Sequence, residues 1–349
     1  MYSCGITPYD VTHLGHAAAF VWAGTLSRVL HAEGADVIVC RDLTDVDDVL
    51  FAAADRAGEP YAEFAAVQQF YFEQDMASLR VEAPAIEPRA HTHVGHVVAL
   101  TAGLLARDAA YERAGSVYFR GAAVRDAVPD AADALRLAAE YRDEPGDPCK
   151  EDPFDVAIWR ASGPGQPAWQ SPWGAGRPGW HAECAAIALH AFGSSVDVQA
   201  GGGDLRFPHH AYQAALAETL MGVAPFARAA FSVGVVRVAG QKMAKSAGNL
   251  VLVGDLLAKY PAAAVRLLIL DRPWDQDWEY DPAELEAAAA RLDRLHAAAA
   301  RHAPGAAETA EARIRAALAA NLDVPAALAI AEDAGGQAAR TLSALLGLW

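Results

Sequence analysis

The chain has 349 residues, which is enough for one large domain or two moderate ones with an ample core. Hydrophobic residues make up 53% and charged residues 21%, a balance typical of folded globular proteins that excludes a disordered chain. The 44 acidic and 28 basic residues give a net charge of −16, which disfavours an extended nucleic-acid-binding surface. Four irregularly spaced cysteines do not suggest a disulfide framework, and no targeting or membrane-spanning segment is recognisable. We therefore expect a reduced, cytoplasmic protein without membrane contact.

The first elements in the chain predict a parallel α/β sheet. A strand over residues 2–6, a glycine-containing loop and a helix over 15–33 come first. A second strand over 35–41 leads to TDVDD (residues 44–48), whose acidic side chains can cap a helix that runs to about residue 57. Another helical pattern covers 61–79. Strand–helix–strand units of this length pair in parallel and bind ligands at the carboxyl ends of their strands.

The middle and the end of the chain have different patterns. Between about residues 84 and 155, a helix over 94–106, a hairpin over 110–120 and an acidic segment read as an insertion into the sheet domain. The sheet is expected to resume near 196–199 and 232–238. Alanine and leucine at helical spacing after Asn249 predict a closing helical bundle. We therefore predict a catalytic domain over residues 1–250, with a loop at 240–249, and a bundle over 251–349.

Three short strings place potential metal ligands far apart in the chain. CGITPYDVTHLGH contains Cys4, GRPGWHAEC contains Cys184, and AGGGDLRFPHH contains His209. Two thiolates and one imidazole would form a three-ligand zinc site with an open position, as in catalytic zinc sites. The alternative is three unrelated buried polar residues.

Two further strings suit the phosphates of ATP. HLGH contains His13 and His16 where a strand leads into a helix, and backbone N–H groups at a helix start attract phosphate. KMAKS contains Lys242 and Lys245 on a loop that could close over the triphosphate. Each string alone could be a solvated surface feature, but together they favour a nucleotide site.

The strings CGITPYD, TDVDD, RPGWH-x-EC, GGGDL-x-FPHH and K-M-x-K-S occur in this order across nearly the whole chain, which resembles the cysteine-activating class I aminoacyl-tRNA synthetases. The resemblance implies an α/β fold: a Rossmann-like class I synthetase (HUP) domain with an inserted subdomain, then an α-helical bundle. It implies that Cys4, Cys184 and His209 bind Zn²⁺. His13, His16, Lys242 and Lys245 would stabilise the reacting phosphates of ATP, with Mg²⁺. The residues expected to hold the cysteinyl adenylate are Cys4, Gly5, Ile6, Thr7, Asp42, Leu43, Thr44, Trp180, Gly202, Gly203, Asp204 and Val236.

Within this branch, four features resemble the cysteine ligases of mycothiol biosynthesis more than the cysteinyl-tRNA synthetases. Proline follows threonine in CGITPYD, and NLVLV follows KMAKS. Gln213 occupies the position at which the synthetases carry a further glutamate ligand, and the chain leaves no room for an anticodon-reading domain. The resemblance thus implies an ATP-dependent ligase that joins L-cysteine to the amine of an amino-sugar acceptor, glucosaminyl-inositol, and does not bind tRNA. The sequence does not indicate the oligomeric state.

Three alternatives stay open from the sequence. The chain could cysteinylate another small amine, charge tRNA as a minimal synthetase, or be an inactive binding or regulatory protein. Departures from the family pattern bear on this choice: Ala244 replaces the first serine of the lysine loop, Ala19 stands where the ligases have a threonine, and few residues precede Cys4. Cysteine-dependent ATP–pyrophosphate exchange would separate the inactive protein from the others.

Overall fold

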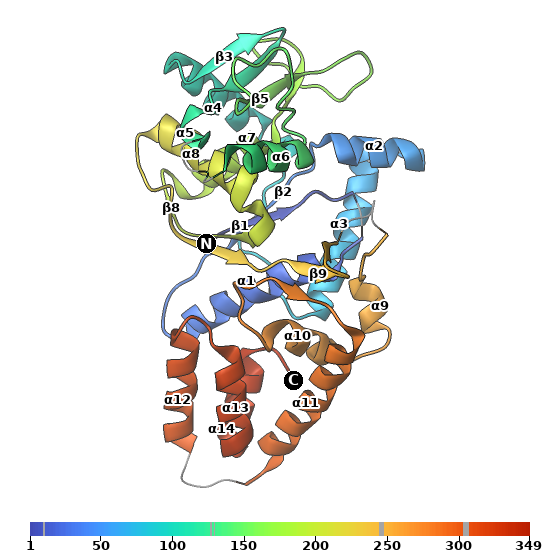
Figure 1. Cartoon of the computed structure of the whole chain (residues 1–349), viewed down its shortest axis with the longest axis vertical. Coiled ribbons are helices and arrows are strands. Elements are labelled where there is room, and N and C mark those ends of the chain that lie inside the picture. The colour runs from blue at the N-terminus through green and yellow to red at the C-terminus, as the bar shows by residue number, and fades with distance from the viewer. Residues whose placement is uncertain (10, 126–127, 129, 244–247, 303–306) are drawn as a thin grey trace.

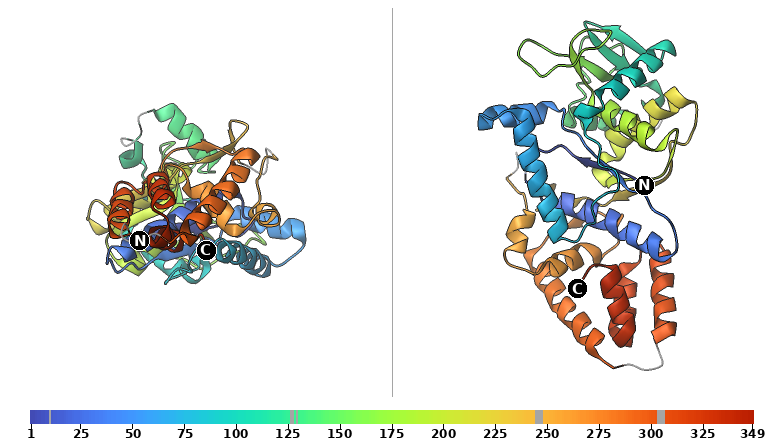
Figure 2. Two further views of the ribbon diagram at one scale, coloured as in Figure 1. Left: turned by 90° about the horizontal axis from the view of Figure 1, so that it is seen from below. Right: turned by 180° about the vertical axis from the view of Figure 1, so that it is seen from behind.

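The computed structural model describes residues 1–349 except 10, 126–127, 129, 244–247 and 303–306. Three parts follow one another along its long axis (Figure 1): a small antiparallel sheet with its helices, a parallel sheet, and a helical bundle. The view from behind in Figure 2 also shows the parallel sheet between the other two parts. Among the described helices, none is long and apolar enough to cross a membrane.

The central sheet has the strand order β2-β1-β7-β8, and all its neighbours pair in parallel. Helix α1 packs on one face, where it shares the largest hydrophobic cluster with the bundle, while α7 and α8 cover the other. The predicted α/β sheet is therefore confirmed. The bounds of these elements are β1 Tyr2–Ile6, α1 Leu14–Ala32, β2 Cys40–Leu43, α7 Trp180–Phe192, β7 Val196–Gly202, α8 Ala211–Met221 and β8 Ala227–Val233.

Two predicted strands differ from the structure. The second strand begins at Cys40, which pairs with Tyr2 of β1, rather than at residue 35 as predicted. The strand predicted over 232–238 is two strands in different sheets. At the break, the Gly234 N–H donates to the carbonyl of Trp274, and a side chain at Gly234 would collide with the Gln276 carbonyl. β9 (Val236–Val238) then pairs with β10 (Gln241–Lys242) and β11 (Trp278–Glu279).

The inserted part is built on an antiparallel sheet of order β3-β4-β5-β6. The predicted hairpin is confirmed as β3 and β4, and the predicted helix as α4, which packs against α7 and α8. The sheet includes β5 and β6, so the sequence that builds it extends to Pro178, past the predicted boundary at residue 155. The elements here are η1 Ala90–Thr92, α4 Val94–Ala106, β3 Ala110–Arg113, β4 Ser116–Phe119, α5 Ala122–Arg125, α6 Ala131–Glu140, β5 Val156–Ala161 and β6 Gly176–Pro178.

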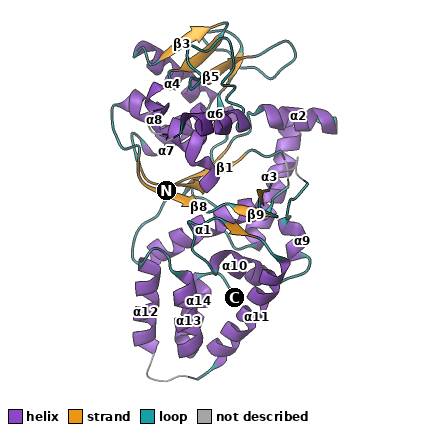
Figure 3. Ribbon diagram, viewed as in Figure 1, coloured by secondary structure: helices purple, strands orange, loops and turns teal. Residues whose placement is uncertain are grey.

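The opposite end of the molecule consists of helices (Figure 3). The buried Arg266 on α10 joins this end to the rest of the chain: its Nε donates to the Leu346 carbonyl at 2.9 Å and its Nη1 to the Leu79 carbonyl at 2.5 Å. These carbonyls belong to the last turns after α14 and α3. The remaining helices are α2 Asp48–Ala57, α3 Tyr61–Ser78, α9 Val253–Leu257, α10 Ala262–Leu270, α11 Pro282–Ala300, α12 Ala307–Ala319, α13 Val324–Ala334 and α14 Gly336–Leu345.

Candidate active site

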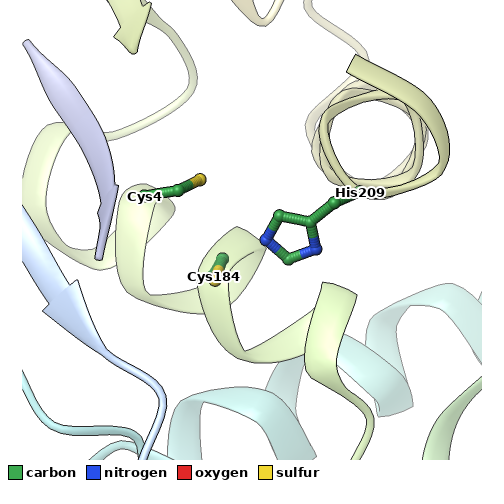
Figure 4. A group of neighbouring side chains, drawn as sticks. All are labelled: Cys4, Cys184 and His209. Atoms are coloured by element: carbon green, nitrogen blue, oxygen red, sulfur yellow. The ribbon is translucent and has the colours of Figure 1, made fainter. Parts of the chain in front are cut away.

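The three predicted metal ligands meet in the fold. Cys4 lies on β1, Cys184 in the second turn of α7, and His209 in the turn Arg206–His210 that leads into α8. Their ligand atoms all lie within 4.8 Å of one another, and the His209 ring points toward the two cysteines (Figure 4). All three side chains are buried. Two sulfurs and one imidazole nitrogen at this separation are a donor set that fits zinc and leaves a coordination position open.

The three side chains of this cluster differ in their tendency to ionise. Burial opposes loss of the Cys4 proton, yet the neighbouring Cys184 and the charge of His210 lower the Cys4 pKa well below its ordinary value. The pKa of Cys184 is raised well above its ordinary value by burial and by the neighbouring Cys4. Burial also lowers the pKa of His209 to about 4 although Cys4 opposes this, so the imidazole is neutral at pH 7. Neutral imidazole is the ligand form, and a bound cation would let both thiols ionise.

The surroundings of the cluster orient its histidine. The His181 ring lies 2.8 Å from the Nδ1 atom of His209, and its Nε2 lies 2.9 Å from Asp143. On the opposite side, the Nε2 atom of Gln213 lies 2.8 Å from the Nε2 atom of His209 and 3.3 Å from the Cys4 sulfur. Gln213, which replaces the further glutamate ligand of the synthetases, thus reaches the cluster but brings no charge. A carboxylate–histidine–histidine chain of this kind fixes the ring orientation of a metal ligand.

His13 and His16 lie at the start of α1. The Nδ1 atom of His13 accepts hydrogen bonds from the backbone N–H groups of Gly15 (3.1 Å) and His16 (3.4 Å), which places the ring proton on Nε2. The two rings stack with their centroids 3.7 Å apart. Burial lowers the pKa of His16 to about 4, against the attraction of Asp204, so this ring is neutral too. His13 can therefore donate a hydrogen bond to phosphate from Nε2, and the neutral His16 ring can donate one without bringing a positive charge.

Lys242 brings the positive charge to this end of the site. Its Nζ lies 2.6 Å from the Oδ2 atom of Asp204 and 2.7 Å from the hydroxyl of Tyr141. Although burial opposes it, the ion pair with Lys242 lowers the pKa of Asp204. The segment after the lysine loop pairs with the segment around His13: the Leu14 N–H donates to the Val251 carbonyl, and the Val253 N–H to that of Thr12. This pairing brings the two predicted phosphate motifs together. Lys245 and Ala244 lie outside the described residues.

One cavity of about 710 Å³ connects these groups. The predicted residues on its wall are Cys4, Gly5, Ile6, Thr7, His13, His16, Thr44, Trp180, Cys184, Gly202, Asp204, His209, Val236 and Lys242. The predicted adenylate residues Asp42, Leu43 and Gly203 do not line it.

These three residues support the wall instead. Asp42 accepts from the Gly5 N–H at 2.7 Å and from the Cys184 thiol at 2.8 Å, and burial raises its pKa to about 6. Leu43 is buried in β2, and Gly203 packs against the carbonyl of Val233. Asp42 and Leu43 are neighbours on β2 and point to opposite faces of the sheet, Asp42 toward Cys184 on α7 and Leu43 into the hydrophobic cluster shared with α1.

Sequence reasoning missed Tyr141, which connects both ends of the cavity. Its hydroxyl donates to Asp204 at 2.9 Å, and its ring is parallel to that of Trp180 with centroids 6.0 Å apart. Trp180 in turn stacks on His209 with centroids 3.7 Å apart. That Trp180 lies beside the substrate side chain stays a prediction. Tyr141 follows α6 in the insertion, in a segment whose acidic composition gave no sign of an aromatic contact with the sheet domain.

Known proteins resemble this chain over most of its length. Residues 1–290 match the family model of the tRNA synthetases class I (C) catalytic domain. The chain is 45% identical to the L-cysteine:1D-myo-inositol 2-amino-2-deoxy-alpha-D-glucopyranoside ligase of Nocardia farcinica, over 95% of this chain and 83% of the relative. It is 42% identical to the ligase of the same name from Mycobacterium ulcerans, over 100% of this chain and 90% of that one.

Solved structures share the fold at low identity. The methionyl-tRNA synthetase of Mycobacterium tuberculosis in complex with methionyl-adenylate superposes with a TM-score of 0.69 at 16% identity, covering 95% of this chain and 82% of that one. The LeuRS of Agrobacterium radiobacter, in a ternary complex with tRNA and LeuAMS, gives a TM-score of 0.65 at 12% identity, covering 100% and 83%. At these identities the likeness shows the fold alone, and it confirms the predicted Rossmann-like synthetase architecture. The chain therefore belongs to the family of class I (C) synthetase catalytic domains, together with the L-cysteine:1D-myo-inositol 2-amino-2-deoxy-alpha-D-glucopyranoside ligases.

Proposed function

We propose that this protein is an ATP-dependent ligase that activates L-cysteine as cysteinyl adenylate and transfers it to the amine of 1D-myo-inositol 2-amino-2-deoxy-alpha-D-glucopyranoside. The observation that carries the proposal is the convergence of Cys4, Cys184 and His209 in the same cavity as a phosphate-binding end. Its relatives at 41–45% identity bear the name of that ligase. The net charge of −16 favours a small-molecule acceptor over tRNA.

The sulfur end of the cavity would select cysteine. Zinc held by Cys4, Cys184 and His209 would take the substrate thiolate as a further ligand, which serine and valine cannot match. The chain's own residues complete the pocket: Trp180 covers His209, and Thr7 and Thr44, whose hydroxyls lie 2.8 Å apart, lie on the same wall. An analogue without a thiol would leave the open position of the metal unfilled, so the pocket can reject such analogues strongly without an editing domain.

The first chemical step would occur at the other end. A carboxylate oxygen of cysteine attacks the α-phosphorus of ATP, the bond to the bridging oxygen breaks, and pyrophosphate leaves. His13 and His16 would donate hydrogen bonds to the phosphate oxygens, and the Lys242 ammonium would offset the growing negative charge. Lys245 is proposed for the same role from the sequence, and Mg²⁺ would enter with ATP.

In the second step the acceptor amine attacks the carbonyl carbon of the adenylate. The carbon–nitrogen bond forms, the bond from that carbon to the phosphate oxygen breaks, and AMP leaves while the nitrogen loses a proton. Beyond the residues predicted to hold the adenylate, the cavity also extends to Asp47, Glu140 and Arg142. The second step therefore has room in the same site.

Cysteine-dependent ATP–pyrophosphate exchange tests the activation step. Cys184→Ala and His209→Ala should lose both exchange and bound zinc, measured by elemental analysis of the purified protein. Cys149→Ala removes a thiol that lies outside the cluster and should retain both. Full exchange in a metal-free Cys184→Ala protein would contradict the proposed role of the metal. No exchange in the wild-type protein would contradict the proposed enzymatic activity.

The acceptor is tested separately with the same preparation. Amide formation with glucosaminyl-inositol supports the proposal. If the protein charges tRNA, or transfers cysteine only to a different small amine, the proposed acceptor is wrong, but the proposed activation of cysteine still stands.

A further inference from the structure

One wall of the cavity carries charged side chains that neither the metal cluster nor the phosphate end accounts for. Asp47, Glu140 and Arg142 line the cavity. Asp47 lies at the start of α2 in the sheet domain, while Glu140 ends α6 and Arg142 follows it in the insertion. This wall is thus shared between two parts of the fold.

Asp47 and Arg142 form an ion pair across that wall. The Oδ1 atom of Asp47 caps α2 by accepting from the Val49 N–H at 2.8 Å, and Nη1 of Arg142 lies 3.2 Å from the same oxygen. The Asp47 side chain is only 9% exposed, whereas that of Arg142 is 51% exposed. Burial and the capping hydrogen bond fix the Asp47 carboxylate in position, while the exposed Arg142 guanidinium can still turn toward a ligand.

Asp47 and Arg142 line the same cavity as the groups at its sulfur end and its phosphate end. Stacked rings lead from His209 to Trp180 and from Trp180 to Tyr141, and Arg142 is the next residue in the chain. Tyr141 also contacts Asp204 and Lys242 at the phosphate end. The carbonyl of an adenylate joins the amino-acid end to the phosphate end. A molecule seated against Asp47 and Arg142 would share the cavity with that junction.

We propose that Asp47 and Arg142 form the acceptor subsite of the cavity, and that its ligand is a primary amine carrying several hydroxyl groups. This inference rests on the proposed function. The Asp47 carboxylate accepts hydrogen bonds from the ammonium and hydroxyl groups of such a molecule, and the Arg142 guanidinium donates to its hydroxyl oxygens. The amine releases its extra proton to solvent before its lone pair attacks the carbonyl carbon, and the nitrogen's remaining surplus proton leaves as AMP departs.

The chain provides a matched control one residue away. Asp48 and Arg177 form a second ion pair, with Nε of Arg177 2.9 Å from Oδ1 of Asp48, which joins α2 to β6. It likewise connects the sheet domain to the insertion, but neither residue lines the cavity. Removing this pair reports any structural effect of separating the two parts.

The experiment compares Asp47→Asn and Arg142→Gln with Asp48→Asn and Arg177→Gln. Asparagine caps a helix about as well as aspartate, so Asp47→Asn removes the charge and keeps α2 intact. For each variant, cysteine-dependent ATP–pyrophosphate exchange reports activation, and amide formation over a range of glucosaminyl-inositol concentrations gives the KM for the acceptor. Calorimetric titration with the same acceptor measures its binding directly.

We expect Asp47→Asn and Arg142→Gln to raise the acceptor KM roughly ten- to a hundredfold, as loss of a charge-assisted hydrogen bond does, with exchange kept within about twofold. The control pair should change neither. An unchanged acceptor KM in Asp47→Asn, or an equal rise in Asp48→Asn, would overturn the subsite. So would loss of exchange in Asp47→Asn, because the pair would then serve activation.

Failure of the proposed function gives a different pattern. A wild-type protein without exchange, or one that exchanges but transfers cysteine to no amino sugar, would refute that function. Calorimetry still decides the subsite in that case: binding of glucosaminyl-inositol that is lost in Asp47→Asn supports it, and no binding to the wild type rejects it.

Discussion

Replacing Tyr141 by phenylalanine isolates the hydroxyl that connects the insertion to the phosphate end. The ring and its stacking on Trp180 remain, but the hydroxyl's bonds to Asp204 (2.9 Å) and Lys242 (2.7 Å) are lost. Hydrogen bonds to charged groups contribute about 1.5–3 kcal/mol each, and the direct Lys242–Asp204 contact survives. The side chains of Lys242 and Asp204 are 39% and 29% exposed, so water replaces part of the loss. We expect a net cost of about 1–2 kcal/mol.

That cost corresponds to a roughly 5- to 30-fold fall in kcat/KM for cysteine-dependent ATP–pyrophosphate exchange. Tyr118→Phe is the matched control, because the Tyr118 hydroxyl also donates to a carboxylate, that of Asp147 at 2.8 Å, but neither residue lines the cavity. Tyr118→Phe should leave exchange unchanged within about twofold. Wild-type exchange in Tyr141→Phe, or an equal loss in both variants, would refute a role for Tyr141 in holding Lys242 at the site.

Two further substitutions test how the fold supports the site. Gly5→Ala would place a Cβ 1.5 Å from the Asp42 carbonyl, so it should lower the free energy of unfolding by more than about 4 kcal/mol. In the control Gly95→Ala in α4, nothing lies within 4 Å of the new Cβ, so the free energy of unfolding should stay the same or rise by about 0.5–1 kcal/mol. Equal denaturation midpoints for the two variants would contradict this. Arg266→Met leaves the Leu79 and Leu346 carbonyls without their donor, so it should lower the free energy of unfolding in urea by about 2–4 kcal/mol. In the control Arg228→Met, the lost ion pair with Asp197 is exposed, so the free energy of unfolding should change by less than about 0.5 kcal/mol. Wild-type stability of Arg266→Met would show that packing alone holds the bundle.

The sequence could predict which side chains gather in the cavity because each lies in a short local pattern. The Cys4, Cys184 and His209 strings specify donor types, and because zinc accepts a small range of donor sets, these residue types favour the proposed zinc and thiol substrate. Hydrophobic periodicity likewise predicted the parallel sheet, the hairpin at 110–120 and the helices at both ends.

The tertiary structure decided what depends on contacts between distant segments. That Asp42 supports the cavity wall rather than lining it follows from its contacts with Gly5 on β1 and Cys184 on α7, which are both distant in the chain. The position of Tyr141 against Trp180 and Asp204 comes from folding the insertion back over the sheet, and no local pattern encodes that approach. The same packing brings Asp47 and Arg142 to one wall, although 94 residues separate them in the chain. The local sequence determines the chemical groups and the secondary structure around them. Burial of apolar surface between segments far apart in the chain determines which of these groups come into contact.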